Sequence, residues 1–532
     1  RDRLFDRLWE EVKTTPRMAR LIAAEIADLW RGDIPYFSTR PASHDVWGSD
    51  GQCFAGEFLR SGMEEVRRRL DQLGEKDLAR QLWYLRASIA TLMSESDGGT
   101  PSGYHLIESG PAADREGLLA ASRAVADWIT EQAVRGAAGD VSWIGLTLVR
   151  DEHYSLLPLG TDLYDGVPGV ALFLAYLGKF TGEERYTDVA RACLKTMWRR
   201  LGPDKRHKTV DGIGGFSGWG GILYTLAHLG TLWNEPEIFA AAGEYVSGLP
   251  RLIEQDKYFD IGSGSAGCIA GLLCLHRCAP SGATLAAAVQ CGDHLLASAL
   301  SMANGLGWDW PWPSRGPLIG YAHGAAGIAL ALLQLEEQTG EERFRAAARQ
   351  AIAYERSVFS AEASNWPDLR LFGVSAAQAA DIPLLYSTSW CHGAPGVGLA
   401  RLRSLAYLDD ALLRGEIDTA VRTTQAKGFG LNHILCHGDL GNLELLLEVA
   451  RTFPEARGAG AAPLAAEIKR LAAGILNSIE QDGWLCGNPT GLVSPGLMTG
   501  IAGIGYQLLR LAEPDKVPSV LTLAPPLPAA MA

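Results

Sequence analysis

The chain has 532 residues, of which 47% are hydrophobic and 20% are charged, and this is enough for one large globular domain and a smaller one. The net charge of −13 gives no support for binding to nucleic acid or to an anionic membrane, because both would require a basic surface. No run of about 18 uncharged apolar residues is present, and Arg1-Asp2-Arg3 does not begin a signal peptide. We therefore expect a cytoplasmic protein without a membrane span, and a chain that is a piece of something longer.

The nine cysteines also favour a reducing compartment, because their number is odd and their spacing shows no disulfide framework. Most of them are expected to be structural thiols, since free Cys behaves as a small hydrophobic residue. These are Cys268, Cys274, Cys278 and Cys291 in apolar helical sequence, and Cys53, Cys193 and Cys486, which we leave structural or unassigned.

In chain order, the first predicted elements are helices over residues 4–12, 18–30 and 63–92. Residues 97–103 read Asp-Gly-Gly-Thr-Pro-Ser-Gly, a composition typical of a flexible connector. We place a domain boundary there, with a small helical region over residues 1–105 and a large domain over 106–532.

The large domain contains seven Gly-x-x-Gly tetrads, whose starts are separated by 45 to 69 residues. Each tetrad opens an apolar stretch, and residues 170–177 are an example that is apolar nearly all round. The segments between tetrads, such as residues 183–195, are amphipathic. The tetrads start at Gly166, Gly218, Gly264, Gly324, Gly393, Gly438 and Gly500.

An inner apolar helix and an outer amphipathic helix, repeated seven times, predict an all-α fold, an α/α toroid of two concentric rings. One helix pair alone cannot bury its apolar face, so the repeats must stack. The glycines allow tight turns and close backbone approach near the axis of the toroid.

Cys391 and Cys436 each lie two residues before the first glycine of their repeat, in the sequences Trp-Cys-His-Gly and Leu-Cys-His-Gly. Equivalent positions of neighbouring repeats lie at the same end of a toroid, so these thiols and His437 can converge near its axis. Two thiolates and an imidazole suit Zn²⁺, and three protein ligands leave the open position of a catalytic zinc. The alternative to a zinc site is that the two Cys-His pairs have this spacing by accident.

His323 lies directly before the fourth tetrad and should face the same end of the ring, which makes it a candidate acid/base residue. Asp260, before the third tetrad, could orient that histidine, although an Asp in a loop is commonly only a cap. Asp165 reads as a cap. Such a site would bind a substrate thiol, lower its pKa and use it as a nucleophile, so the implied chemistry is thiol alkylation or thiol addition.

With these motifs, residues 110–532 resemble the LanC-type lanthionine cyclases. The resemblance rests on seven Gly-x-x-Gly repeats, with His-Gly in the fourth, Trp-Cys-x-Gly in the fifth and Cys-His-Gly in the sixth. It implies a zinc ion held by Cys391, Cys436 and His437, with Asp260 and His323 as the catalytic pair. The implied reaction is Michael-type addition of a peptide Cys to dehydroalanine or dehydrobutyrine, which forms lanthionine or methyllanthionine.

The chain departs from the family pattern beside the fifth-repeat cysteine. Stand-alone cyclases can carry Tyr directly after that cysteine and Arg four residues before it, whereas this chain has His392 and Ser387. His392 is a candidate second proton donor or a supporting group, so the residue that protonates the product stays open.

The sequence Asp-Ile-Pro-Tyr-Phe at residues 33–37 and the tail at residues 517–523 are similar to class II lanthipeptide synthetases, the bifunctional LanM enzymes. Those enzymes dehydrate Ser and Thr with ATP and Mg²⁺ before they cyclise. No Gly-rich phosphate loop with its Lys is present here, so we expect cyclisation without dehydration, and ATP and Mg²⁺ only in a missing core. The expected partner is a precursor peptide with a leader in a bacterial cytoplasm, and a monomer is favoured.

The sequence has three other possible interpretations. His437-Gly438-Asp439 superficially resembles a phosphotransferase catalytic loop, but Glu444 lies where that loop would need Asn. A prenyltransferase-like toroid also activates thiols with zinc, but it would use an Asp, Cys and His ligand set and a deep aromatic lipid pocket. A peptide-binding toroid without catalysis would keep the fold, and candidate acid/base residues at positions 260 and 323 favour an enzyme over it.

Overall fold

The computed structural model describes residues 2–13, 15–93, 103–104, 106, 112–149, 153–202, 210, 212–371, 382–408, 410–458, 462–488 and 491–527. The chain divides into two compact units, Arg1–Arg86 and Ala87–Ala532. The predicted connector at residues 97–103 lies almost entirely outside the described residues, and the predicted domain boundary stays a prediction.

The first unit contains short helices and a small antiparallel sheet. Its elements are α1 (Asp2–Val12), η1 (Pro16–Arg20), α2 (Ile22–Arg31), β1 (Phe37–Ser38), β2 (Val46–Gly48), β3 (Cys53–Phe54), α3 (Gly62–Leu70) and the start of α4 (Glu75–Met93). The single helix expected over residues 63–92 is therefore wrong. It is two helices, because the chain turns after Leu70 and the carbonyl of Gly74, a poor helix former, accepts the first hydrogen bond of α4.

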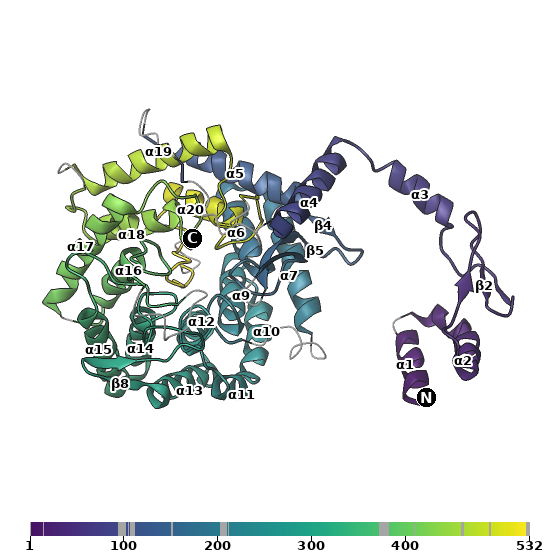
Figure 1. Ribbon diagram of the computed structural model, residues 1–532, viewed down its shortest axis with the longest axis horizontal. Helices are drawn as coiled ribbons and strands as arrows, with labels where there is room; N and C mark the ends of the chain where they lie inside the picture. Colours follow the sequence, from purple (N-terminus) through teal and green to yellow (C-terminus); the bar gives the residue numbers. More distant parts are fainter. Residues whose placement is uncertain are drawn as a thin grey trace. The chain divides into compact units, whose positions relative to one another are not determined.

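The second unit is a double ring of helices, in which every inner helix begins within or directly after a Gly-x-x-Gly tetrad (Figure 1). In its described part, the inner helices are α6 (Val167–Thr181), α9 (Trp219–Trp233), α12 (Ser265–Cys278), α14 (Ala325–Thr339), α16 (Ala394–Ser404), α18 (Asp439–Thr452) and α20 (Ile501–Ala512). Their outer partners are α5 (Arg115–Gln132), α7 (Glu184–Leu201), α10 (Pro236–Val246), α13 (Gly282–Ser298), α15 (Glu342–Ser357), α17 (Ala411–Lys427) and α19 (Leu464–Asp482), and the short α11 (Leu249–Glu254) precedes the third repeat.

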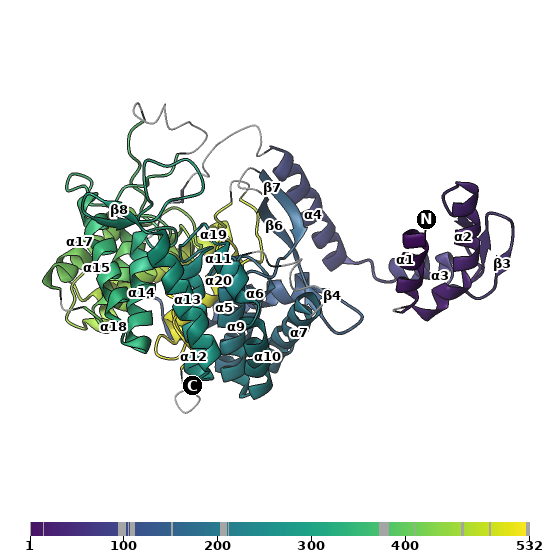
Figure 2. The same cartoon turned by 90° about the horizontal axis from the view of Figure 1, so that it is seen from below.

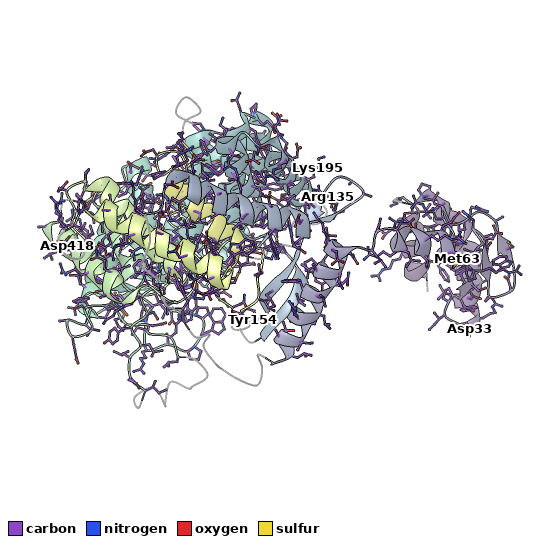
Figure 3. The ribbon with its side chains drawn as sticks, turned by 90° about the horizontal axis from the view of Figure 1, so that it is seen from above. Asp33, Met63, Arg135, Tyr154, Lys195 and Asp418 are labelled. Atoms are coloured by element: carbon purple, nitrogen blue, oxygen red, sulfur yellow. The ribbon has the colours of Figure 1, made fainter. Side chains whose placement is uncertain are left out.

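Burial explains why the ring forms. The inner helices are largely buried, and in α6 every residue from Val167 to Gly178 is buried. The outer helices keep charged side chains at the surface, such as Lys195 on α7 and Asp418 on α17 (Figure 3). Because α20 packs against both α18 and α6, the inner ring closes on itself. The predicted all-α toroid is confirmed.

The second glycine of each tetrad is required by close backbone packing. A Cβ atom on Gly441 would lie 1.8 Å from the carbonyl oxygen of Leu435, and one on Gly396 would lie 2.0 Å from that of Trp390. No side chain fits at such distances, so the loop before each inner helix folds directly onto the start of that helix. This packing fixes the loops that carry the candidate site residues.

Short hairpins interrupt the helical pattern. They are β4 (Val134–Arg135) with β5 (Val141–Ser142), β6 (Ile144–Val149) with β7 (His153–Pro158), and β8 (Leu300–Met302) with β9 (Gly305–Gly307). Seen from the side, β6, β7 and β8 lie toward one end of the ring (Figure 2). No helix in the described part of the chain is both long and apolar enough to cross a membrane.

The C-terminal tail is part of the core. Val517, Val520 and Leu521 are buried, and the carbonyl of Leu521 accepts a hydrogen bond of 3.0 Å from the Trp390 indole. The carbonyl of Ala524 accepts a second one of 3.0 Å from the Tyr224 hydroxyl. The tail thereby joins inner-helix repeats that are far apart in sequence.

We predict that Leu521→Ala lowers the free energy of unfolding by about 3 kcal/mol, because it removes buried methyl groups and leaves a cavity. The measurement is chemical or thermal unfolding followed by circular dichroism. Leu412→Ala removes the same atoms from a side chain that is 62% exposed, and it should change stability by less than about 0.5 kcal/mol. Equal effects of both substitutions would contradict a structural role for the tail.

Candidate active site

The structure brings Cys391 and Cys436 together. The backbone N–H of Cys391 donates to the carbonyl of Cys436 at 3.3 Å, and the backbone N–H of Cys436 donates to the carbonyl of Met498 at 3.0 Å. The loops before the fifth, sixth and seventh inner helices are thus joined edge to edge. The two thiol groups also lie close enough for each to shift the pKa of the other.

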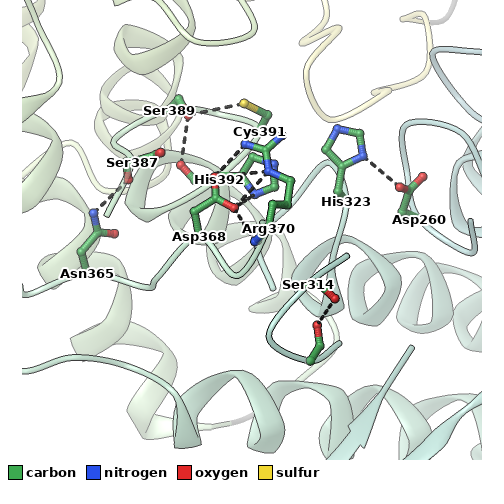
Figure 4. A network of polar contacts seen from close by, with 12 residues as sticks. Asp260, Ser314, His323, Asn365, Asp368, Arg370, Ser387, Ser389, Cys391 and His392 are labelled. Atoms are coloured by element: carbon green, nitrogen blue, oxygen red, sulfur yellow. Dashed lines mark hydrogen bonds and ion pairs between the residues drawn. The ribbon is translucent and has the colours of Figure 1, made fainter. Parts of the chain in front are cut away.

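Neighbouring side chains hold the two thiols in place. The hydroxyl of Tyr164 donates to Sγ of Cys436 at 3.0 Å, and Oγ of Ser389 lies 3.4 Å from Sγ of Cys391 (Figure 4). Gly393 has a φ of 95°, in the left-handed region that favours glycine. That conformation turns the chain from the cysteine loop into α16.

The two thiols differ in environment and in acidity. The adjacent Cys436 thiol, together with the nearby His437 and Arg370, holds the pKa of the Cys391 thiol well below its ordinary value. The pKa of Cys436 lies well above its ordinary value because of the adjacent Cys391 thiol and because of burial. Cys391 is partly exposed, whereas Cys436 is buried. Thiolate character is what a metal ligand or a nucleophile needs.

His437 follows Cys436 directly and is partly exposed. Its Nε2 lies 3.0 Å from the carbonyl oxygen of Gly487, so that contact orients the ring. Among the described residues, no three His, Cys, Asp or Glu side chains are already arranged to hold a metal ion. The adjacent thiol pair and an imidazole one residue away nevertheless make a donor set of the kind zinc prefers. The fit of these residues to zinc therefore rests on the chemistry of their sulfur and nitrogen atoms.

Asp260 and His323 form a close pair, as the register of the repeats predicted. Nδ1 of His323 donates to Oδ2 of Asp260 at 2.9 Å. Asp260 is fully buried, and its Oδ1 accepts the N–H of Ser263 at 2.6 Å, while the His323 side chain is 26% exposed. The carboxylate thus fixes the imidazole, and Nε2 is the nitrogen left to exchange a proton. Their catalytic roles stay predictions.

His392 lies against this pair and is buried. Its ring stacks on that of His323, with centroids 5.4 Å apart, and its Nδ1 lies 3.9 Å from Oδ1 of Asp368. Burial, helped by the nearby Arg370, lowers the pKa of His392 to about 4. Within the described part of the chain, its Nε2 has no hydrogen-bond partner. A neutral, buried imidazole is in place here, and its role as a proton donor stays a prediction.

Arg370 is a site residue that the sequence reasoning missed. Its Nε and Nη2 donate to Asp368 at 3.0 and 2.7 Å, and these hydrogen bonds hold the pKa of Asp368 below its usual value against the effect of burial. Its charge lies close enough to both thiols to act on them. Arg370 comes from the long loop between α15 and α16, outside the Gly-x-x-Gly repeats, so no repeat signal points to it (Figure 4).

Other acidic residues near the tetrads make structural contacts. Asp165 accepts hydrogen bonds from the N–H groups of Met498 and Thr499 at 3.1 and 3.0 Å, and burial raises its pKa to about 7. It thereby joins the first and seventh repeats. Glu444 is buried and pairs with Arg510 at 2.9 Å, so the phosphotransferase interpretation has no support from this position.

The comparisons with known proteins agree with this architecture. A family model described as "Lanthionine synthetase C-like protein" matches residues 158–522, and a model described as "Domain of unknown function (DUF4135)" matches residues 1–40. The biosynthesis protein for lacticin 481/lactococcin, LcnDR2 of Lactococcus lactis subsp. lactis, is 23% identical over 512 residues. Those residues are 92% of this chain and 50% of LcnDR2, so the chain spans about half the length of this curated relative.

Among solved structures, the nisin cyclase is similar with a TM-score of 0.51 and 16% sequence identity. The match covers 76% of this chain and 96% of the nisin cyclase, and at this identity it is a likeness of fold.

The closed double ring of helices, with a thiol pair and an Asp-His pair in its tetrad loops, defines the class of protein as an α/α toroid. Because the family model matches well over half of the chain, the chain belongs to the lanthionine synthetase C-like family. The predicted relation to the cyclase portion of a LanM enzyme is confirmed, as is the prediction of a lanthionine cyclase.

Proposed function

We propose that this chain catalyses zinc-dependent formation of lanthionine and methyllanthionine rings. In the proposed reaction, Cys thiolates of a ribosomal precursor peptide add to dehydroalanine or dehydrobutyrine of the same peptide. The observation that carries the proposal is the contact between Cys391 and Cys436 in the same set of loops as the Asp260–His323 pair. Family membership supports ring formation, and this geometry supplies residues for it.

In this proposal, Cys391, Cys436 and His437 hold the metal. A zinc ion bound there would lower the pKa of a substrate thiol and keep it as a thiolate at neutral pH. Tyr164 and Ser389, which contact the two sulfur atoms, keep both thiols aimed at one point. Partial exposure of Cys391 and His437 leaves that point open to a peptide.

Proton transfer is assigned to His323. In the addition, the substrate thiol first loses its proton, and its sulfur then bonds to the β-carbon of the dehydro residue. The α-carbon of that residue takes up one proton in return. Nε2 of His323, held in place through the Nδ1 contact with Asp260, either accepts the first proton or delivers the second. His392 stacks on His323 and is the alternative donor, or a group that limits the motion of His323.

Several wider features stay part of the proposal. The substrate is a precursor peptide whose leader binds the enzyme, the protein works in a bacterial cytoplasm, and a domain boundary lies near residue 105. We also propose that the chain does not itself dehydrate Ser or Thr. Prenyltransferase-like alkylation is the alternative chemistry, and turnover of an isoprenoid substrate would distinguish it.

The test is a cyclisation assay with a dehydrated precursor peptide that contains Cys. Cyclisation does not change the mass, so free thiols are alkylated and the peptide is then analysed by mass spectrometry. Loss of alkylation that depends on the chain and on bound zinc is the expected result. A zinc-loaded chain that leaves every thiol free would contradict the proposed function.

For Arg370→Ala we expect the rate of cyclisation to fall by about 10- to 100-fold with zinc content unchanged, because a positive charge is lost beside Cys391 and Cys436, where the substrate thiolate would bind the metal. Arg370→Lys should recover part of the rate, since it keeps the charge but not the paired contact with Asp368. The readouts are the alkylation assay and the zinc content. Arg422→Ala on the outer helix α17 is the control, and equal rates for the two Ala variants would contradict this role.

A further inference from the structure

Three aromatic side chains cluster beside the Asp260–His323 pair. Ring centroids of Trp310 and Trp312 lie 5.1 Å apart, those of Tyr258 and Trp312 lie 5.4 Å apart, and those of Tyr258 and Trp310 lie 6.2 Å apart. We call Tyr258, Trp310 and Trp312 the aromatic cluster. Its members come from two loops, the one before α12 and the one that follows β9.

The aromatic cluster faces solvent in part. Trp312 is 40% exposed, and Tyr258 and Trp310 are half-buried. Large apolar side chains in such positions commonly mark a binding surface, and Trp and Tyr are enriched where partners bind. Trp310 packs against the hydrophobic core, and this contact explains much of its burial. Packing within the chain does not explain why one face of Trp312 is exposed.

The loop of the two tryptophans is held rigidly. Its sequence, Trp310-Pro-Trp-Pro313, has two prolines that restrict the backbone. The N–H of Leu371 donates to the carbonyl of Pro313 at 3.0 Å, and the N–H of Arg315 donates to that of Leu369 at 2.8 Å. The same backbone pairing therefore places the tryptophans and Arg370 in adjoining segments. A rigid aromatic surface loses little entropy when it binds a ligand.

The aromatic cluster adjoins the candidate catalytic residues. The ring of Trp310 meets that of His323 edge-on, with centroids 5.2 Å apart, and Tyr258 is two residues from Asp260. Consecutive residues of a peptide are about 3.8 Å apart. A dehydro residue whose α-carbon lies at His323 therefore has its direct neighbour within reach of Trp310 and Trp312.

We propose that the aromatic cluster is a subsite for a large apolar side chain, aromatic or aliphatic, on a residue directly next to the dehydro residue of the peptide. This inference rests on the proposed function, because it takes His323 as the place where that residue reacts. The occupant is apolar because three aromatic rings form the surface. The subsite selects which dehydro residues the enzyme accepts.

The test measures binding with the full chain and unreactive peptides, so that it does not require turnover. Fluorescein-labelled peptides carry Ser at the reacting position, with Phe, Ala or Lys on both sides of it, and their Kd values are measured by fluorescence anisotropy. The wild-type chain should bind the Phe peptide roughly tenfold more tightly than the Ala peptide. Trp312→Ala should lose most of this ratio, and Trp312→Phe should keep most of it.

Leu412→Ala, which removes an exposed apolar side chain from the outer helix α17, is the control and should leave the ratio unchanged. An equal ratio in wild type and Trp312→Ala would overturn the inference, as would tighter binding of the Lys peptide than of the Phe peptide. Cyclisation of dehydrated peptides with the same flanking residues is measured in parallel. Failure of the proposed function would appear there as no turnover, while the Kd ratios still decide the subsite.

Discussion

Replacement of Cys391 by Ala is expected to abolish zinc binding and ring formation together. The wild-type chain should contain about one zinc per molecule, and loss of one of two thiolate ligands should lower the affinity by well over 100-fold. Cyclisation should fall with the metal, because the substrate thiol would keep its ordinary pKa. The measurements are elemental analysis of the purified chain and the alkylation assay on one dehydrated peptide.

The matched control is Cys193→Ala. Cys193 is fully buried in the outer helix α7, so its replacement should affect stability and leave both zinc and activity intact. Zinc content and activity that are unchanged in Cys391→Ala would contradict the assignment of the thiol pair. Loss of activity with zinc retained would instead mean that Cys391 is needed for the reaction but not for holding the metal.

The second large effect is expected for His323→Ala. The rate of cyclisation should fall by about 10² to 10⁴, the usual range for loss of a general acid or base, with zinc content unchanged. Asp260→Asn should have a smaller effect, because it leaves the imidazole in place and removes only the charge that orients it through Nδ1. Rates are measured with saturating peptide, so that kcat is compared rather than binding.

His276→Ala is the control for His323, since His276 lies at the end of α12 and its Nδ1 contacts the backbone of Ser281. If His323→Ala cyclises at the wild-type rate, the proton must come from elsewhere. His392, stacked on His323, would then be the next residue to replace.

The fold could be predicted from the sequence because its signal is repeated. The Gly-x-x-Gly spacing follows from a physical need, the contact between the second glycine and the carbonyl six residues before it, as at Gly441 and Leu435. The same register predicted that Cys391 would lie beside Cys436 and Asp260 beside His323, because equivalent loops of neighbouring repeats adjoin. The chemical roles of these residues are still predictions.

Features that depend on the loops between repeats could not be predicted. Arg370, Trp310 and Trp312 come from segments without a repeat signal, and backbone pairing between Pro313 and Leu371 brings these two segments together. The buried tail is held by carbonyl contacts, such as that of Leu521 with Trp390, which leave no mark on side-chain pattern. In the first unit, a turn over residues 71–74 divides a predicted helix in two.

The proposed function depends on one zinc ion held by Cys391, Cys436 and His437 at the reacting site. X-ray absorption at the zinc edge of the purified, zinc-loaded chain tests it most directly. We predict two sulfur ligands at about 2.3 Å and one nitrogen at about 2.0 Å, with a third sulfur appearing when a Cys-containing peptide is added. A spectrum with only nitrogen and oxygen ligands would contradict zinc binding by the two cysteines. A spectrum that the peptide leaves unchanged would contradict binding of the substrate thiol to the metal.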